Sequence, residues 1–105
     1  MKIWSHETGD DGAPLIALVH GSMDRSAGVL RLSRCLDREF RVLRYDRRGY
    51  GRSAPHPGPF GADHQVGDLL ELLEGRRALV FGHSYGGNVA LALTARHPDL
   101  VARDG

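Results

Sequence analysis

Three short runs of apolar residues punctuate the chain, and longer segments with polar residues at helical spacing separate them. The runs cover residues 15–19, 42–45 and 78–81, and the first and last contain no polar residue. Such runs are typical of strands that are buried on both faces of a parallel sheet. We expect a further short edge strand at residues 3–5, because a dense turn signal at 9–14 follows it.

Two segments between the runs have the pattern of amphipathic helices. From about residue 26 to 40, apolar residues recur every three or four positions, and Asp24 or Ser26 is expected to cap the first turn. The second helix is expected to be capped by Asp63 and to be closed by Gly75. Its leucines share one face, and its acidic residues point outward.

A third helix is expected from about Gly86 to His97, where Pro98 helps to end it. A strand followed by a helix, three times over, predicts an α/β fold with a doubly wound, mostly parallel sheet. Right-handed crossovers place helices on both faces of such a sheet, which gives three α/β/α layers. At 105 residues the chain is expected to form one domain at most.

Composition excludes several classes of partner and leads us to expect a soluble, cytoplasmic protein. The formal net charge of +1 implies binding to neither nucleic acid nor an anionic membrane. A single cysteine, Cys35, cannot form an internal disulfide, and we expect it at the core or its boundary in a reducing compartment. No segment has the length and apolarity of a signal peptide or a membrane span. The histidines lack metal-ligand spacing, so we expect neither a metal nor another cofactor.

The most informative segment is Gly82-His83-Ser84-Tyr85-Gly86-Gly87, directly after the last apolar run. A serine between two glycines, where a strand turns into a helix, has the pattern of a nucleophile elbow. The glycines suit a turn without room for side chains, and backbone N–H groups at the helix start can hold a developing negative charge. The alternative is a helix that Ser84 merely caps. Nucleotide binding fits poorly, because the dinucleotide fingerprint has glycine where Ser84 stands.

Three stretches in this order, residues 20–23, 45–53 and 82–87, resemble the α/β-hydrolase superfamily. The resemblance extends from about Leu15 to His97 and corresponds to the amino-terminal part of a typical member. It implies a serine hydrolase that cleaves ester, amide or related acyl bonds of a small-molecule substrate through an acyl-enzyme. A serine at position 84 argues against the aspartate-nucleophile branches, such as dehalogenases and epoxide hydrolases.

The same resemblance implies specific roles around the nucleophile Ser84. One oxyanion N–H would come from Ser22, with Met23 as the alternative, and the second from Tyr85. The family's counterpart of His20 is mainly structural, so we expect an internal hydrogen bond there.

The stretch 45–53 resembles the family's D-x-R-G-x-G-x-S turn, which we interpret as a support of the pocket wall. Gly49 and Gly51 would permit the sharp backbone path. Asp46 would accept N–H groups of the turn or pair with a nearby arginine.

The family's acid and histidine, which follow the serine in that order, are not recognisable here. After Ser84 the only acids are Asp99 and Asp104, and no histidine follows either. His97 would lie roughly 20 Å from the serine along the helix. We therefore expect residues 1–105 to be the amino-terminal part of a single, truncated α/β-hydrolase domain. The alternative function is a catalytically silent fragment or ligand-binding scaffold.

Without later strands, the apolar strand at 78–81 would lie at an exposed edge of the sheet. Unpaired backbone groups on such an edge recruit other chains. We therefore expect self-association through this edge.

Overall fold

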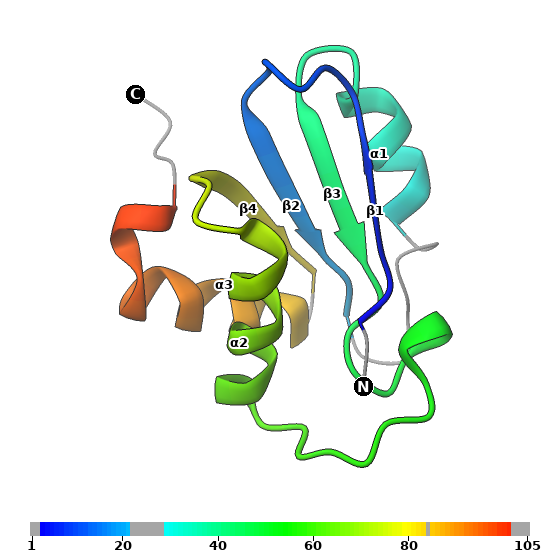
Figure 1. Ribbon diagram of the computed structural model, residues 1–105, viewed down its shortest axis with the longest axis vertical. Helices are drawn as coiled ribbons and strands as arrows, with labels where there is room; N and C mark the ends of the chain where they lie inside the picture. Colours follow the sequence, from blue (N-terminus) through cyan, green and yellow to red (C-terminus); the bar gives the residue numbers. More distant parts are fainter. Residues whose placement is uncertain (1–2, 22–28, 84, 102–105) are drawn as a thin grey trace.

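The computed structural model describes residues 3–21, 29–83 and 85–101 (Figure 1). Strands and helices alternate from β2 to α3, as the apolar pattern predicts. The elements are β1 (Ser5–Thr8), β2 (Leu15–Val19), α1 (Leu30–Leu36), β3 (Arg41–Tyr45), α2 (Ala62–Leu73), β4 (Ala78–Gly82) and α3 (Tyr85–Arg96), with 3₁₀ turns at Gly51–Ser53 and Pro98–Leu100.

The four strands form one sheet in the order β1-β3-β2-β4. β2 pairs in parallel with both β3 and β4, and only β1 is antiparallel to its neighbour β3. The predicted mostly parallel α/β sheet is therefore confirmed. Because parallel strands end at the same edge, the loops that follow Val19, Tyr45 and Gly82 leave the sheet on one side. Candidate binding residues in α/β sheets lie at such an edge.

Helices cover both faces of the sheet, which gives the three expected layers (Figure 1). On one face, α2 and α3 pack against residues that include Ala17, Val19 and Leu43. On the other face, Leu18 and Val42 pack with partly buried side chains of the α1 segment. Successive residues of β2 thus point to opposite cores, which explains why the whole run is apolar.

The first helix is shorter than the predicted segment 26–40. α1 begins at Leu30, and Val29 takes the N-cap position without a side-chain hydrogen bond. The suggested caps Asp24 and Ser26 lie outside the described residues. Cys35 is exposed, so its predicted place at the core or its boundary is wrong.

Two further boundaries differ from the sequence prediction. The edge strand is β1 at Ser5–Thr8 and not residues 3–5, because its ladder with β3 runs from Ser5 to Thr8. Asp63 lies inside the first turn of α2, where Gly61 is the N-cap, and its carboxylate pairs with Arg96 of α3. The predicted end of α2 is confirmed, since Gly75 follows the last turn with φ +78°.

β4 lies at the end of the sheet, as expected from the sequence. Its outer side carries an isolated parallel bridge from Ala78 to Val101. Phe81 of this strand is 43% exposed, which is unusual for a large apolar side chain on a strand. Within the part of the chain that the structure describes, no helix is long and apolar enough to cross a membrane.

Candidate active site

The turn from β4 into α3 is as tight as the elbow pattern predicts. Only two residues separate Gly82, the last residue of β4, from Tyr85, the first residue of α3. A Cβ atom on Gly82 would lie 2.3 Å from the Gly86 carbonyl oxygen, a distance that real Cβ atoms essentially never show. The predicted need for glycine at Gly82 is thus confirmed. Ser84 lies outside the described residues, and its role as nucleophile stays a prediction.

The start of α3 packs against the end of β2. The N–H of His83 donates to the carbonyl oxygen of Val19 at 3.0 Å, and a Cβ on Gly86 would lie 2.2 Å from that same oxygen. The His20 carbonyl oxygen would be 2.6 Å from this Cβ. Glycine at position 86 therefore allows the helix to approach the β2 backbone closely.

The structure describes only one of the two residues that are predicted to donate N–H groups to the oxyanion. Ser22, and its alternative Met23, lie outside the described residues, directly after a described segment that ends at Gly21. Tyr85 is the first residue of α3, and N–H groups in the first turn of a helix have no partner within the helix. The assignment of both donors stays a prediction.

His20 has the structural role that the sequence interpretation gave it. Its ring is fully buried. Nδ1 lies 2.8 Å from the carbonyl oxygen of Gly21, and Nε2 accepts the backbone N–H of Arg47 at 2.9 Å. Since Nε2 accepts, the ring is neutral with its proton on Nδ1. Both nitrogens are used inside the protein, so His20 is not placed to act as a general base.

The turn after β3 is organised by the buried carboxylate of Asp46. Oδ2 accepts the backbone N–H of Arg52 at 2.9 Å, as predicted for an acceptor of turn N–H groups. Gly51 has φ +47°, and a Cβ there would lie 2.6 Å from Asp46 Oδ2, while Gly49 has φ +86°. The hydroxyl of Ser53 donates to the Asp46 carbonyl oxygen at 2.6 Å. The predicted supporting role of this turn is confirmed.

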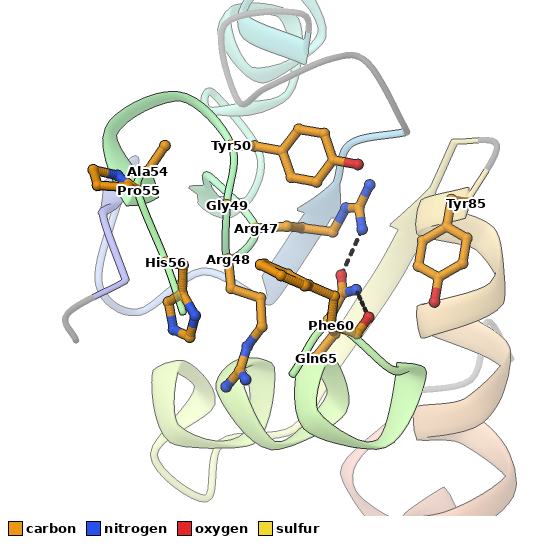
Figure 2. A pocket seen from close by; sticks show the side chains of 10 residues that line it. All are labelled: Arg47, Arg48, Gly49, Tyr50, Ala54, Pro55, His56, Phe60, Gln65 and Tyr85. Carbon is orange, nitrogen blue, oxygen red and sulfur yellow. Dashed lines mark hydrogen bonds between the residues drawn. The ribbon is translucent and has the colours of Figure 1, made fainter. Parts of the chain in front are cut away.

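Arg47 is the residue of this site that sequence reasoning missed. It is only 1% exposed, and its Nε donates to the His20 carbonyl oxygen at 3.0 Å. Its Nη1 donates to Oε1 of Gln65 on α2. The guanidinium carbon lies 4.6 Å from the ring centroid of Tyr50 and 4.9 Å from that of Tyr85 (Figure 2). Arg47 thus connects the ends of β2 and β3 to α2 and the start of α3.

The neighbouring Arg48 is held differently. Its Nε and Nη2 donate to the two carboxylate oxygens of Asp68 at 2.7 Å each, and its Nη1 donates to the Pro59 carbonyl oxygen. The hydrogen bond to Asp68 raises the pKa of the Arg48 guanidinium. The charge of Arg48 is therefore balanced inside the protein.

A cavity of about 800 Å³ opens beside these arginines (Figure 2). Phe60 lies on its wall and is 49% exposed, so an aromatic surface is available to a ligand. The described residues that line the cavity are Arg47, Arg48, Gly49, Tyr50, Ala54, Pro55, His56, Phe60, Gln65 and Tyr85. Because Tyr85 directly follows Ser84, the cavity lies next to the elbow.

Comparison with known proteins finds relatives that share one fold. A sequence model of a family described as alpha/beta hydrolase fold matches residues 14–103. A hydrolase of known structure from Pseudomonas aeruginosa is 37% identical with a TM-score of 0.88, covering 94% of this chain and 38% of that one. An enol-lactonase from Burkholderia xenovorans is 34% identical with a TM-score of 0.87, covering 96% of this chain and 41% of its own.

A curated relative gives the same result. Lipase LipV from Mycobacterium tuberculosis is 35% identical over 97 residues, which are 90% of this chain and 36% of the lipase. The chain thus spans about a third of the length of the curated relatives it matches.

Proposed function

This chain belongs to the α/β-hydrolase family, and on that premise we propose that it supplies the nucleophile and the oxyanion hole of a serine hydrolase. The reaction is hydrolysis of an ester, amide or related acyl bond of a small molecule through an acyl-enzyme. The observation that carries the proposal is the turn from β4 into α3. There Gly82 and Gly86 have no room for a Cβ, and α3 starts against the end of β2.

In this proposal the Ser84 hydroxyl attacks the acyl carbon, and the carbonyl oxygen becomes an oxyanion. The N–H groups of Tyr85 and Ser22 receive that charge, one from each of two loops. The close contact of Gly86 with the Val19 and His20 carbonyl oxygens supports this arrangement, because it keeps the two loops adjacent. Loss of one donor typically costs about 3 kcal/mol of transition-state stabilisation.

The alternative function is a catalytically silent scaffold, which residues 1–105 would form if they act without an acid and a base of the triad. In the family's order a histidine follows the acid, but within residues 1–105 no histidine follows Asp99 or Asp104. His20 is engaged at both ring nitrogens. The proposal therefore assigns no general base to these 105 residues. We also propose a cytoplasmic location, because an exposed cysteine without a disulfide, such as Cys35, is typical of a reducing compartment.

A fluorophosphonate probe separates the two functions. If the proposal is right, the Ser84 oxygen bonds to phosphorus, fluoride leaves, and the protein gains one label that Ser84→Ala abolishes. Ser5→Ala is the matched control, because Ser5 is exposed on the edge strand β1 and its loss leaves labelling unchanged. Labelling that survives Ser84→Ala contradicts the proposal, and an unlabelled but folded wild-type protein favours the silent scaffold.

A further inference from the structure

We propose that Arg47 forms a carboxylate-binding subsite beside the elbow. The substrate would then carry an ionised carboxylate in addition to the acyl bond that is cleaved. This inference rests on the proposed function, because it names the substrate class of the same site. It starts from a guanidinium nitrogen in the interior of the protein. The Nη2 atom of Arg47 is buried and makes no hydrogen bond within the described part of the chain.

The charge of Arg47 is not balanced by the residues that hold it. Its hydrogen-bond partners are the His20 carbonyl oxygen and the Gln65 amide oxygen, which are both neutral. Among the residues that the structure describes, no carboxylate forms an ion pair with Arg47, whereas Arg48 beside it is paired with Asp68. A buried charge without a counter-ion is costly, so the site is poised to accept an anion.

Of the three guanidinium nitrogens, Nη2 is the one that can still accept an anion as a partner. Tyr50 and Tyr85 place their rings against the group, while Nε and Nη1 are occupied by His20 and Gln65. In Figure 2 the guanidinium reaches between the two tyrosines, with one terminal nitrogen directed at Gln65 and the other away from it. A carboxylate can therefore meet Arg47 at Nη2, where two N–H donors are free.

The subsite borders both the cavity and the proposed nucleophile. Arg47, Tyr50 and Tyr85 all line the cavity of about 800 Å³, which offers space for the substrate. Nη2 itself is covered, so an anion can reach it only if a neighbouring side chain moves. Tyr85, whose ring lies against the Arg47 guanidinium, follows Ser84 in the chain, so the substrate that this proposal names is a short dicarboxylic monoester.

The test measures binding without catalysis, so that it stays separate from the labelling experiment. In the Ser84→Ala protein, isothermal titration calorimetry compares glutarate with its uncharged dimethyl ester. We expect glutarate to bind at least about tenfold more tightly, and Arg47→Met to remove this preference. Arg52→Met is the control, because Arg52 is exposed on the same turn and stacks on Trp4.

Each outcome decides the question. Equal binding of the two ligands, or no binding of either, overturns the subsite. A preference that survives Arg47→Met, or that Arg52→Met removes equally, also overturns it. If Arg47→Met does not fold, two measurements still decide the question. The first compares the two ligands on the Ser84→Ala protein, and the second uses Arg47→Lys, for which we expect a partial loss of the preference for glutarate. A labelled Ser84 without glutarate binding refutes only the subsite, whereas glutarate binding without labelling refutes only the hydrolase.

Discussion

Replacing Gly86 with alanine would place a methyl group against the backbone at the end of β2. The new Cβ would lie 2.2 Å from the Val19 carbonyl oxygen and 2.6 Å from the His20 carbonyl oxygen. The shorter distance is roughly 1 Å below the 3.4 Å at which ordinary contacts begin. Both are backbone atoms, one of the last residue of β2 and one of the residue directly after it, so neither can turn away as the end of a side chain could.

The expected cost follows from what must move. Overpacking of this kind costs about 1–3 kcal/mol. Displacing α3 from the end of β2 also weakens the hydrogen bond from His83 to Val19, which is worth about 1 kcal/mol. Alanine in place of glycine within a helix returns about 1 kcal/mol. We therefore expect Gly86→Ala to lower the free energy of unfolding by about 1–3 kcal/mol.

The matched control is the next residue of α3. A Cβ on Gly87 would lie 3.6 Å from the Gly82 carbonyl oxygen, an ordinary contact, so Gly87→Ala is expected to gain up to about 1 kcal/mol. Urea unfolding followed by circular dichroism compares both variants with the wild type. If the two alanine variants have the same stability to within about 0.5 kcal/mol, the close approach of α3 to β2 is not what requires glycine.

Three further predictions concern other parts of the fold. Hydrogen bonds from Arg76 chiefly lower the pKa of the Glu7 carboxyl group below its usual 4.5. The ionised carboxylate therefore stabilises the folded state above that pH, and this stabilisation is lost as the pH falls below it. The urea midpoints of wild type and Glu7→Gln should converge between pH 6 and pH 3, and a constant gap would contradict this. Tyr45→Phe should leave thermal stability unchanged or raise it by up to about 1 kcal/mol, because the buried hydroxyl has no hydrogen-bond partner among the described residues; a clear loss would refute this. Phe81→Lys on the exposed edge strand should reduce self-association in analytical ultracentrifugation, and unchanged association would exclude this edge.

The interior strands could be predicted from the sequence because their environment determines their composition. β2 has the predicted limits Leu15–Val19, since alternate residues enter two different cores and all must be apolar. β1 has the sequence Ser-His-Glu-Thr, which carries no such signal. Its position is set by pairing with β3, a tertiary contact that local sequence does not encode.

The orientation of the two adjacent arginines could not be predicted. Arg47 and Arg48 are chemically identical and follow one another in a turn, yet one enters the interior beside His20 and the other pairs with Asp68. Their directions depend on a backbone path with positive φ at Gly49 and Gly51. The motif identified the turn and the role of its glycines, but not which side chain it buries.

The carbonyl group of His20 is fixed from two sides by motifs that are distant in sequence. Gly86 lets α3 approach this oxygen, and Arg47 donates its Nε–H to it at 3.0 Å. Parallel pairing brings these groups together, because β2, β3 and β4 end at the same edge of the sheet. The peptide that leads toward Ser22 is therefore held by the turn after β3 and by the elbow after β4. Loosening either contact would displace the same backbone group, so substitutions at Arg47 and Gly86 should not be additive.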